Sequence, residues 1–409
     1  MGDEIKKDTL KKLFPKGQLE TSPETLTTSR SNKKIVIGIP TETTLQENRV
    51  ALVPNSVRYL TGHGVNVRVE AGAGENSFFS NHDYSEAGAE ICYDKKTVFE
   101  SEVILKVAPP TLEEIDLLHP NQILISPLQM PTLDSQYLKK LREKRVLAVA
   151  MEYLQASDGS FPIVRIMSEI AGLSVIHTAA ELLSNVNQGR GVLLGGIAGV
   201  PPAKVVILGA GVVGEMATRS ALGLGASVRI FDNDVHKLMR LQNRIGQPLH
   251  TSAINPVYLQ YQLLSADVVI GAIHSKHGQA PMVVTEDMVA KMKPGTVIID
   301  VSIDQGGCVE TSRVTSHSNP TFLAYDVIHY CVPNIASKVS RTASIAVSNI
   351  ITPILLKMAD LQSLDALLYE DRGLRNGVYT YHGSVTNEYL AQRFGLKYAS
   401  LDLLLTSGL

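Results

Sequence analysis

The chain is poor in cysteine, with three in 409 residues. Cys92, Cys308 and Cys331 lie far apart and form no CxxC pair, so zinc ribbons and redox dithiols are not expected. Few, scattered cysteines are typical of proteins from a reducing compartment, and we therefore expect a cytoplasmic protein.

An excess of charge of either sign is also missing. The 38 Lys and Arg nearly balance the 40 Asp and Glu, which leaves a net charge of −2. Such a chain has no general basic character for binding nucleic acid or anionic membranes, and we expect neither partner. The composition, 44% apolar and 19% charged, is that of a globular protein, and the length is enough for two domains.

Targeting signals and long apolar runs are scarce as well. Residues 1–33 are polar and mixed in charge, without the apolar region of a signal peptide, and their acids argue against a transit peptide. We expect a polar N-terminal extension there, either a short helix or a tail. The apolar stretch 191–214 is interrupted by Pro201, Pro202 and Lys204, so it indicates a buried parallel strand rather than a membrane span.

Short apolar runs alternate with amphipathic segments along the rest of the chain. Helical patterns occupy 54–64 and 131–144, and strand-like runs occur at 34–40, 65–70, 101–108, 122–128 and 145–152. This alternation predicts βαβ units and a parallel sheet.

A second series of strand-like runs begins at Lys204 and is bracketed by two long helix-like segments, 167–183 and 342–361. Its runs are 204–208, 227–232, 267–273 and 296–302. We therefore predict an α/β protein of two doubly wound domains. A Rossmann NAD-binding domain, 165–340, is expected to be inserted into a discontinuous, flavodoxin-like substrate domain, 34–164 and 341–409, with the active site in the cleft between them.

The second series opens with GAGVVG, in which Gly209, Gly211 and Gly214 follow a strand-like run and begin a helix-like one. Asp232 ends the next strand 18 residues beyond Gly214, close to the about 20 residues of the dinucleotide fingerprint. The first glycine allows the tight turn, the second lets backbone approach the pyrophosphate, and the third permits close packing of the helix. Asp232 would accept from ribose hydroxyls and repel a 2′-phosphate, which favours NAD. The alternative is a glycine-rich turn in a domain that binds nothing.

Two basic residues follow strand-like runs of the first series. Arg49, in LQENRVALVP, lies in a loop where it could clamp a carboxylate with two hydrogen bonds, although it could also be a surface arginine. Lys106, in SEVILKVAPP, interrupts an apolar strand. It could hold a substrate oxygen or transfer a proton at a lowered pKa, unless it lies on an edge strand and faces water.

Two aspartates, Asp300 and Asp304, end the apolar run TVIIDVSIDQGG. A carboxylate there could act on a substrate amine or a water beside the nicotinamide, whereas the competing interpretation is turn chemistry with the glycines. The histidines lack metal-ligand spacing, so no metal site is expected, and we interpret them as structural or surface residues: His274, His277, His317 and His329.

Taken together, residues 34–395 resemble the alanine dehydrogenase family, which shares its fold with the NAD-binding part of proton-translocating transhydrogenase. The matching stretches are GIPTETTLQENRVALVP, ILKVAPP, IMSEIAG, LLGGIAGVPPAKVVILGAGVVG, MKPGTVIIDVSIDQGGCVETSR, HSNPTF and YCVPN. The resemblance implies NAD-dependent oxidative deamination of L-alanine to pyruvate and ammonia, and a homo-hexamer.

The resemblance also implies roles for individual residues. It puts Arg49 on the substrate carboxylate, Lys106 beside the substrate carbonyl or imine, and Asp304 between substrate and nicotinamide. Lys106 and Asp304 are the implied catalytic residues, and Gln129 lines the substrate site. The implied cofactor-binding residues are Ser168, Gly209, Gly211, Val212, Val213, Gly214, Asp232, Lys237 and Asn334.

The sequence departs from the family at two points. Gln129 stands where the family has a histidine that is its proposed proton donor and acceptor, and an amide cannot exchange a proton near neutral pH. Arg165, just before MSEIAG, is an extra cation that would suit a larger or dicarboxylic substrate if it points inward, and means nothing if it points outward.

Three functions therefore stay open. The first is an NAD-dependent amino-acid dehydrogenase, with alanine as the leading substrate. The second is a soluble nucleotide-binding subunit of a transhydrogenase, which would need a membrane partner. The third is an NAD sensor or scaffold without activity, for which the loss of the family histidine is the argument.

Overall fold

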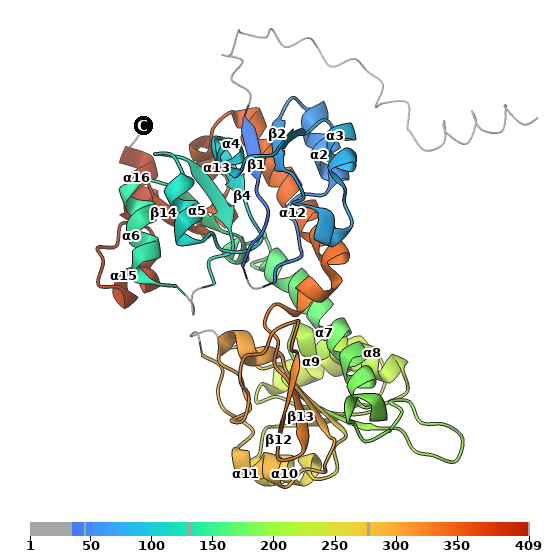
Figure 1. The fold of residues 1–409 in the computed structure, drawn as a ribbon. Helices are drawn as coiled ribbons and strands as arrows, with labels where there is room; N and C mark the ends of the chain where they lie inside the picture. Colours follow the sequence, from blue (N-terminus) through green and yellow to red (C-terminus); the bar gives the residue numbers. More distant parts are fainter. Residues whose placement is uncertain (1–34, 45, 130–132, 276–278, 408–409) are drawn as a thin grey trace, which may run out of the picture. The chain divides into compact units, whose positions relative to one another are not determined.

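A computed structural model describes residues 35–44, 46–129, 133–275 and 279–407 (Figure 1). The N-terminal extension predicted at 1–33 lies outside these residues. The described strands form two sheets, each mostly parallel, which confirms the predicted α/β class.

The first sheet has the strand order β15-β14-β6-β5-β4-β1-β2-β3. Strands β1 to β6 are parallel, β14 is antiparallel to β6, and β15 is antiparallel to β14. The bounds are β1 Val36–Ile39, β2 Asn66–Glu70, β3 Glu90–Cys92, β4 Val103–Leu105, β5 Ile123–Ser126, β6 Leu147–Ala150, β14 Val378–Tyr381 and β15 Ser384–Val385.

The second sheet has the order β12-β13-β11-β10-β7-β8-β9, and only β12 is antiparallel to its neighbour. The bounds are β7 Lys204–Leu208, β8 Ser227–Phe231, β9 His250–Ser252, β10 Val268–Gly271, β11 Val297–Asp300, β12 Thr321–Ala324 and β13 Val327–Tyr330. The apolar stretch 191–214 thus contains the buried strand β7, as predicted from its composition.

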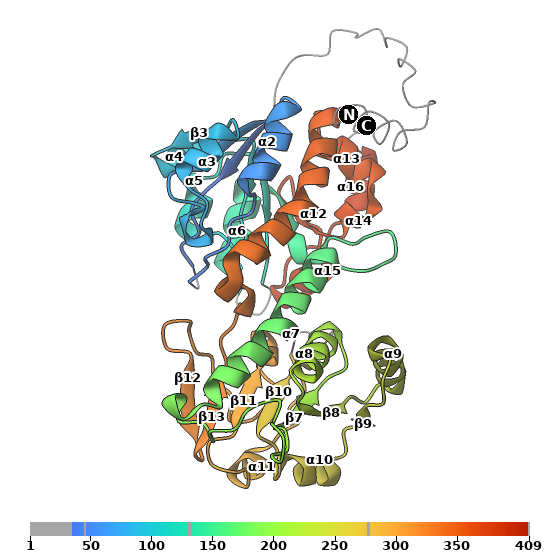
Figure 2. The same cartoon turned by 90° about the vertical axis from the view of Figure 1, so that its right-hand side faces the viewer.

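Helices connect the parallel strands of both sheets (Figures 1 and 2). The helices that belong to the first sheet are α2 Pro54–Gly62, α3 Asn81–Glu86, α4 Lys95–Phe99, α5 Leu112–Leu117, α6 Ser135–Glu143, α13 Leu364–Glu370, α14 Arg372–Arg375, α15 Glu388–Arg393 and α16 Leu401–Ser407. The helices that belong to the second sheet are α8 Val212–Gly223, α9 Val235–Ile245, α10 Pro256–Leu263 and α11 Glu286–Ala290. Many begin with a side-chain cap; Thr111 and Glu114, for example, form a capping box on α5.

Two long helices, α7 (Pro162–Leu182) and α12 (Ser340–Leu361), carry the chain between the sheets and pack on each other (Figure 2). Segments 162–182 and 335–361 are long and apolar enough to cross a membrane by composition, but 39% and 44% of their apolar windows are buried within the fold. Helix α7 packs most extensively against α8, because Gly172 has no Cβ, which would otherwise overlap Val213 and Met216.

The predicted domain boundaries fall near the beginnings of these helices. The boundary at 164/165 lies inside α7, and 340/341 lies at the first turn of α12. Strands of the first sheet come from 36–150 and 378–385, and strands of the second come from 204–330. The discontinuous sheet is therefore observed, while the division at those particular residues stays a prediction.

Each sheet reverses its strand order at one point, and ligands of open α/β sheets bind beside such points at the carboxyl ends of the strands. In the first sheet the reversal lies between β1 and β4, and in the second between β7 and β10. The first is followed by the loops that contain Glu42 and Lys106, and the second by GAGVVG and residues 272–275.

Candidate active site

Lys106 follows β4 directly and is 1% exposed, so it is neither on an edge strand nor in water. Its Nζ lies 2.7 Å from Oε2 of Glu42 and 3.4 Å from Oε2 of Glu114. Glu42 also accepts from the backbone N–H of Val107 at 2.6 Å, and Glu114 also pairs with Lys95 at 3.1 Å. The lysine is therefore the centre of a buried, charge-balanced cluster.

This cluster bears on the expected role of Lys106 in proton transfer. Burial by itself would lower the pKa of the ammonium, but the carboxylates of Glu42 and Glu114 outweigh burial and raise it above its usual value. Lys106 hence stays a cation near neutral pH. The raised pKa gives no support to a lysine base with a lowered pKa and favours a cationic hydrogen-bond donor.

Arg49 is 8% exposed, so the interpretation as a surface arginine is wrong. Its Nε and Nη2 donate to the two carboxylate oxygens of Glu47 at 2.7 and 2.6 Å, and its Nη1 lies 3.0 Å from the sulfur of Met167. Glu47 also accepts from Nδ2 of Asn334 at 2.6 Å. Although burial would raise the pKa of Glu47, its bonds to Arg49 and Asn334 hold that pKa below its usual value.

Asp304 lies in the 3-10 turn Val301–Gln305 after β11 and belongs to the same constellation. As a residue Asp304 is exposed, yet the surrounding protein removes enough water from its carboxyl to raise its pKa to about 6. The backbone N–H of Asn334 and the charge of Arg49 act in the opposite direction, whereas Asp300 adds to the rise. The structure thus brings Arg49, Asp304 and Asn334 together.

The other aspartate of this strand end has a structural role. Asp300 is fully buried and accepts from the backbone N–H groups of Ser302 and Cys308 at 3.0 and 2.9 Å and from the hydroxyl of Ser312 at 2.8 Å. It holds the turn that presents Asp304.

Gln129 lies in the loop after β5, beside the end of β4, so the loop is at the same sheet edge as Lys106. Gln129 is half-buried, and its backbone is in the left-handed region, with a φ of 49°. Its N–H and that of Leu128 donate to Oε1 of Glu152 at 3.0 and 2.9 Å. Burial raises the pKa of Glu152 despite these two bonds. Glu152 therefore fixes the backbone of the loop in which the family histidine is replaced.

The glycine loop has the geometry of a phosphate site. Gly209 has a φ of 110°, and a Cβ there would overlap the Ala272 carbonyl; a Cβ on Gly214 would overlap the carbonyl oxygen of Gly209. A Cβ on Gly211 would meet open space instead. Gly211 is the N-cap of α8 and provides no capping side chain, so the first-turn N–H groups around Val212 and Val213 can bind an anion.

The remaining cofactor candidates lie near this loop or on α7. Asp232, after β8, accepts from the N–H of Ala210 and of Asp234, both at 2.8 Å, and each oxygen keeps capacity for a ribose hydroxyl. Nζ of Lys237 lies 3.9 Å from Asp232. Ser168 is half-buried on α7, one residue after Met167, which contacts Arg49. These residues fit a dinucleotide whose ribose carries no 2′-phosphate.

Arg165 points outward. Its side chain is 48% exposed and pairs with Glu169 one turn along α7 at 3.1 Å. It therefore gives no support to a dicarboxylic substrate.

His329 is a structural histidine, as expected: it is fully buried between the Val327 carbonyl at 3.0 Å and the Thr311 hydroxyl at 2.7 Å. His274 is exposed, and His277 lies outside the described residues. His317 is half-buried and belongs to the site itself: its Nε2 lies 3.3 Å from the carbonyl oxygen of Asn334.

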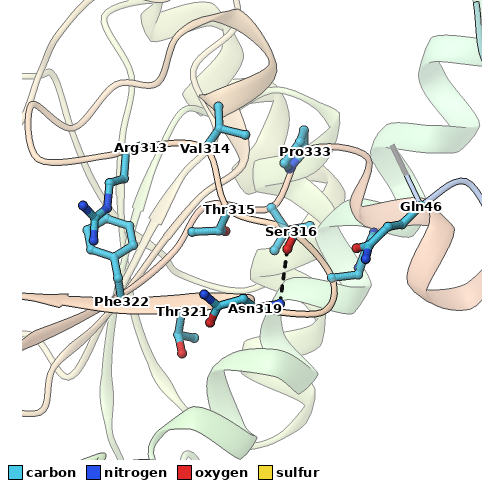
Figure 3. A pocket seen from close by; sticks show the side chains of 11 residues that line it. Gln46, Arg313, Val314, Thr315, Ser316, Asn319, Thr321, Phe322 and Pro333 are labelled. Carbon is cyan, nitrogen blue, oxygen red and sulfur yellow. Dashed lines mark hydrogen bonds between the residues drawn. The ribbon is translucent and has the colours of Figure 1, made fainter. Parts of the chain in front are cut away.

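Two cavities meet beside Gln46 and His317. One, of about 520 Å³, is lined largely by residues 313–322 and also by Val332 and Pro333. Figure 3 shows Arg313 against the ring of Phe322, and Gln46, from the loop after β1, on the opposite side. The other, of about 480 Å³, is lined by Glu42, Thr43, Gln46, Glu47, Asn48, Asn76, His317 and Ser318. Both glutamates of this second cavity are bonded to a cation: Glu42 to Lys106, and Glu47 to Arg49.

Sequence reasoning missed the acidic partners Glu42, Glu47 and Glu114, and the position of His317. The spacing of Glu47 from Arg49 was visible in ENR, and Thr111-x-x-Glu114 was readable as a capping box. That Glu114 also reaches Lys106 depends on strand order, which a local pattern does not contain.

Comparison with known proteins gives one consistent result. Two family models match, "Alanine dehydrogenase/PNT, N-terminal domain" over 38–171 and "Alanine dehydrogenase/PNT, C-terminal domain" over 175–388. Alanine dehydrogenase 2 of Staphylococcus aureus (strain USA300) is 39% identical over 367 residues, which are 90% of this chain and 98% of that protein.

Solved structures agree in fold. An L-alanine dehydrogenase superposes with a TM-score of 0.84 at 37% identity and covers 88% of this chain and 99% of its own. A transhydrogenase from Sinorhizobium meliloti superposes with a TM-score of 0.73 at 24% identity, over 87% of this chain and 99% of its own, which supports the fold alone.

Proposed function

The chain belongs to the alanine dehydrogenase/PNT family, and on that premise we propose that it catalyses the reversible, NAD-dependent oxidative deamination of L-alanine to pyruvate and ammonia. The observation that carries the proposal is the convergence of Arg49, Asp304 and Asn334 beside a cavity that also reaches Lys106 through Glu42. The identity over nearly the full length of an alanine dehydrogenase supports it.

The glycine loop and Asp232 bind NAD in this proposal, with Ser168, Lys237 and Asn334 completing the site. Bound NAD supplies the acceptor for the hydride that leaves the substrate Cα. The open space at Gly211 and the uncapped N-terminus of α8 support a pyrophosphate there.

Arg49 binds the substrate carboxylate. Its Nε–Nη2 edge is held by Glu47 and one Nη1 proton by the sulfur of Met167, which leaves one proton on each of Nη1 and Nη2 to face a ligand. The buried ion pair fixes the guanidinium before substrate arrives, so less side-chain entropy is lost on binding.

Lys106 donates a hydrogen bond to the oxygen of the carbonyl or carbinolamine and remains charged throughout. Its two carboxylate partners leave one ammonium proton for that bond. Asp304, with a pKa of about 6, is ionised at neutral pH and stabilises the positive charge that develops on the imine. Gln129 donates or accepts a hydrogen bond in the substrate site and transfers no proton.

The protein acts in the cytoplasm on a small-molecule substrate, as a homo-oligomer of the hexameric type that the family resemblance implies. The domain division at 165–340 belongs to the same proposal. The transhydrogenase alternative is supported by fold alone, at 24% identity.

The test is absorbance at 340 nm with purified protein, NAD and L-alanine, and in reverse with pyruvate, ammonia and NADH. We expect turnover in both directions. NAD binding without turnover on alanine would contradict the proposal and favour another amino acid or a binding role; a panel of amino and oxo acids separates these two.

A further inference from the structure

The reaction needs a group that can exchange protons near neutral pH, because water adds to an imine and ammonia leaves. Lys106 is held as a cation by two carboxylates, and Gln129 is an amide. Glu42 and Glu47 line the cavity, but each is paired with a cation, at 2.7 and 2.6 Å. Asp304, with a pKa of about 6, can exchange a proton, but in the proposed mechanism it faces the charge of the imine, so the exchange with water and ammonia calls for a second group in the site.

His317 lies where such a group is needed. It lines both cavities, together with Gln46, and its Nε2 lies 3.3 Å from the carbonyl oxygen of Asn334. A carbonyl can only accept, so Nε2 is the nitrogen that carries the proton. In the neutral ring Nδ1 is then a base, and within the part of the chain that the structure describes it has no hydrogen-bond partner.

Asn334 connects this imidazole with the rest of the site. Its N–H donates to Asp304, its side chain donates to Glu47, and its carbonyl accepts from His317. The left-handed φ of Asn334, 58°, turns these groups in different directions. A single residue, Asn334, thus lies between His317 and Asp304 and is hydrogen-bonded to both through its backbone.

The charges around the imidazole are mixed. Burial lowers the pKa of His317 below its usual value; the Asn334 carbonyl and Glu47 act to raise it, and Lys338 and Arg49 act to lower it. The ring is therefore neutral near pH 7 and able to accept a proton.

We propose that His317 is the residue that exchanges protons with the reacting water and with the leaving ammonia. The inference rests on the proposed deamination. It deepens that proposal by assigning, to a loop of the second sheet, a task for which Gln129 is chemically unfit.

The steps balance without any further reactant. After hydride has left Cα, water oxygen bonds to the imine carbon and a water proton passes to Nδ1 of His317. The imidazolium returns that proton to the amine nitrogen. The C–N bond breaks, its electron pair leaves with ammonia, and the hydroxyl proton passes to the imidazole as the ketone forms. The imidazolium then gives this proton to ammonia, which leaves as ammonium, and the neutral ring is restored.

The experiment is stopped-flow absorbance at 340 nm on the full chain with NAD and L-alanine, comparing wild type with His317→Asn. Asparagine can keep a donor for the Asn334 carbonyl but cannot exchange the proton. We expect steady-state turnover to fall by about 10²–10⁴-fold, the usual contribution of a general acid–base group. Hydride transfer should remain, so about one equivalent of NADH per site should form in a burst.

Two further variants separate proton exchange from structural damage. Imidazole added to His317→Ala should restore turnover, and Gln129→His should partly restore it in the His317→Asn background. His63→Asn is the matched control, because His63 also bonds a backbone carbonyl, that of Tyr59 at 2.7 Å, but on the surface of α2. It should behave as wild type.

Unchanged turnover in His317→Asn would overturn the inference and leave the proposed function intact. An equal fall of burst and steady state, without rescue by imidazole, would reduce His317 to a structural residue and overturn it too. Absence of any turnover in the wild type, in either direction, would overturn both proposals together.

Discussion

The two sheets reverse their strand order in the same way, yet the two reversal points are built from different chemistry. At the first, between β1 and β4, Glu42 and Lys106 meet as buried charges. At the second, between β7 and β10, glycines bring backbone N–H groups to the surface and Asp232 is held by backbone donors. Paired side chains organise the first edge, and backbone groups organise the second. Substitutions at the two edges should therefore affect different measured properties.

The largest effect is expected at the charged edge. Lys106→Ala removes the cation between Glu42 and Glu114, and we expect turnover to fall at least about 10³-fold. Stability should fall by about 3–5 kcal/mol, the usual cost of leaving a buried charge without its partner. Steady-state assays and thermal unfolding measure these changes.

Binding of NAD to Lys106→Ala should stay within about twofold of wild type, measured by NADH fluorescence. Near-normal turnover would disprove the role of Lys106. Loss of NAD binding together with activity would show that the two edges are not separable.

A second variant acts on the backbone edge. Gly214→Ala places a Cβ against the Gly209 carbonyl, so the phosphate loop must shift, and we expect NADH to bind at least about tenfold more weakly, a loss of about 1.4 kcal/mol. Gly223→Ala is the matched control on the same helix, since a Cβ there meets open space. Equal affinities in the two variants would contradict the assignment of the loop.

A third variant tests the pH dependence of the site. Because desolvation raises the pKa of Asp304 to about 6, ionisation costs the folded state stability, and this cost builds up as pH rises from about 4, the ordinary pKa of the unfolded chain, to about 6. Asp304→Asn should therefore be more stable than wild type above pH 6, with the difference shrinking as pH falls toward 4. Thermal unfolding between pH 4 and 8 measures it; a constant difference would disprove the raised pKa.

The smallest effect is expected outside both edges. Arg165→Ala removes an exposed pair with Glu169, which should cost no more than about 0.5 kcal/mol. Relative activity on alanine and on dicarboxylic amino acids should stay as in wild type. A change in that ratio would show that Arg165 reaches the substrate after all.

The parallel core of each sheet was predictable from the sequence, whereas its edges were not. Strands β1, β4, β5 and β7 are short apolar runs bounded by polar loops, and their pattern was sufficient. Strands β9 and β12 are half-exposed, and β14 follows the two short helices α13 and α14, so periodicity gave no signal. Pairing with the partner strand, not local propensity, makes them strands.

In the site, motif residues were predictable and their partners were not. The glycine loop and Asp232 have a fixed spacing, and Arg49, Lys106 and Asp304 follow strands. The partner of Lys106, however, is Glu42, in a loop 64 residues earlier, and a partner of Glu47 is Asn334, 287 residues later. Such contacts follow from topology; they favour a cationic Lys106 over a lysine base and show that Arg49 is already paired.

Three consecutive residues of the first sheet's loop each bond to a loop of the second. Gln46 bonds to Ser318, Glu47 to Asn334, and the N–H of Asn48 to the hydroxyl of Ser337. Glu47 also holds Arg49, so Arg49 and Asn334 share one carboxylate partner. Thermodynamic linkage makes any such coupling reciprocal: the factor by which NAD changes the affinity for the oxo acid is the factor by which the oxo acid changes the affinity for NAD. Glu47, two positions before the arginine, is thus the residue through which such a coupling would pass.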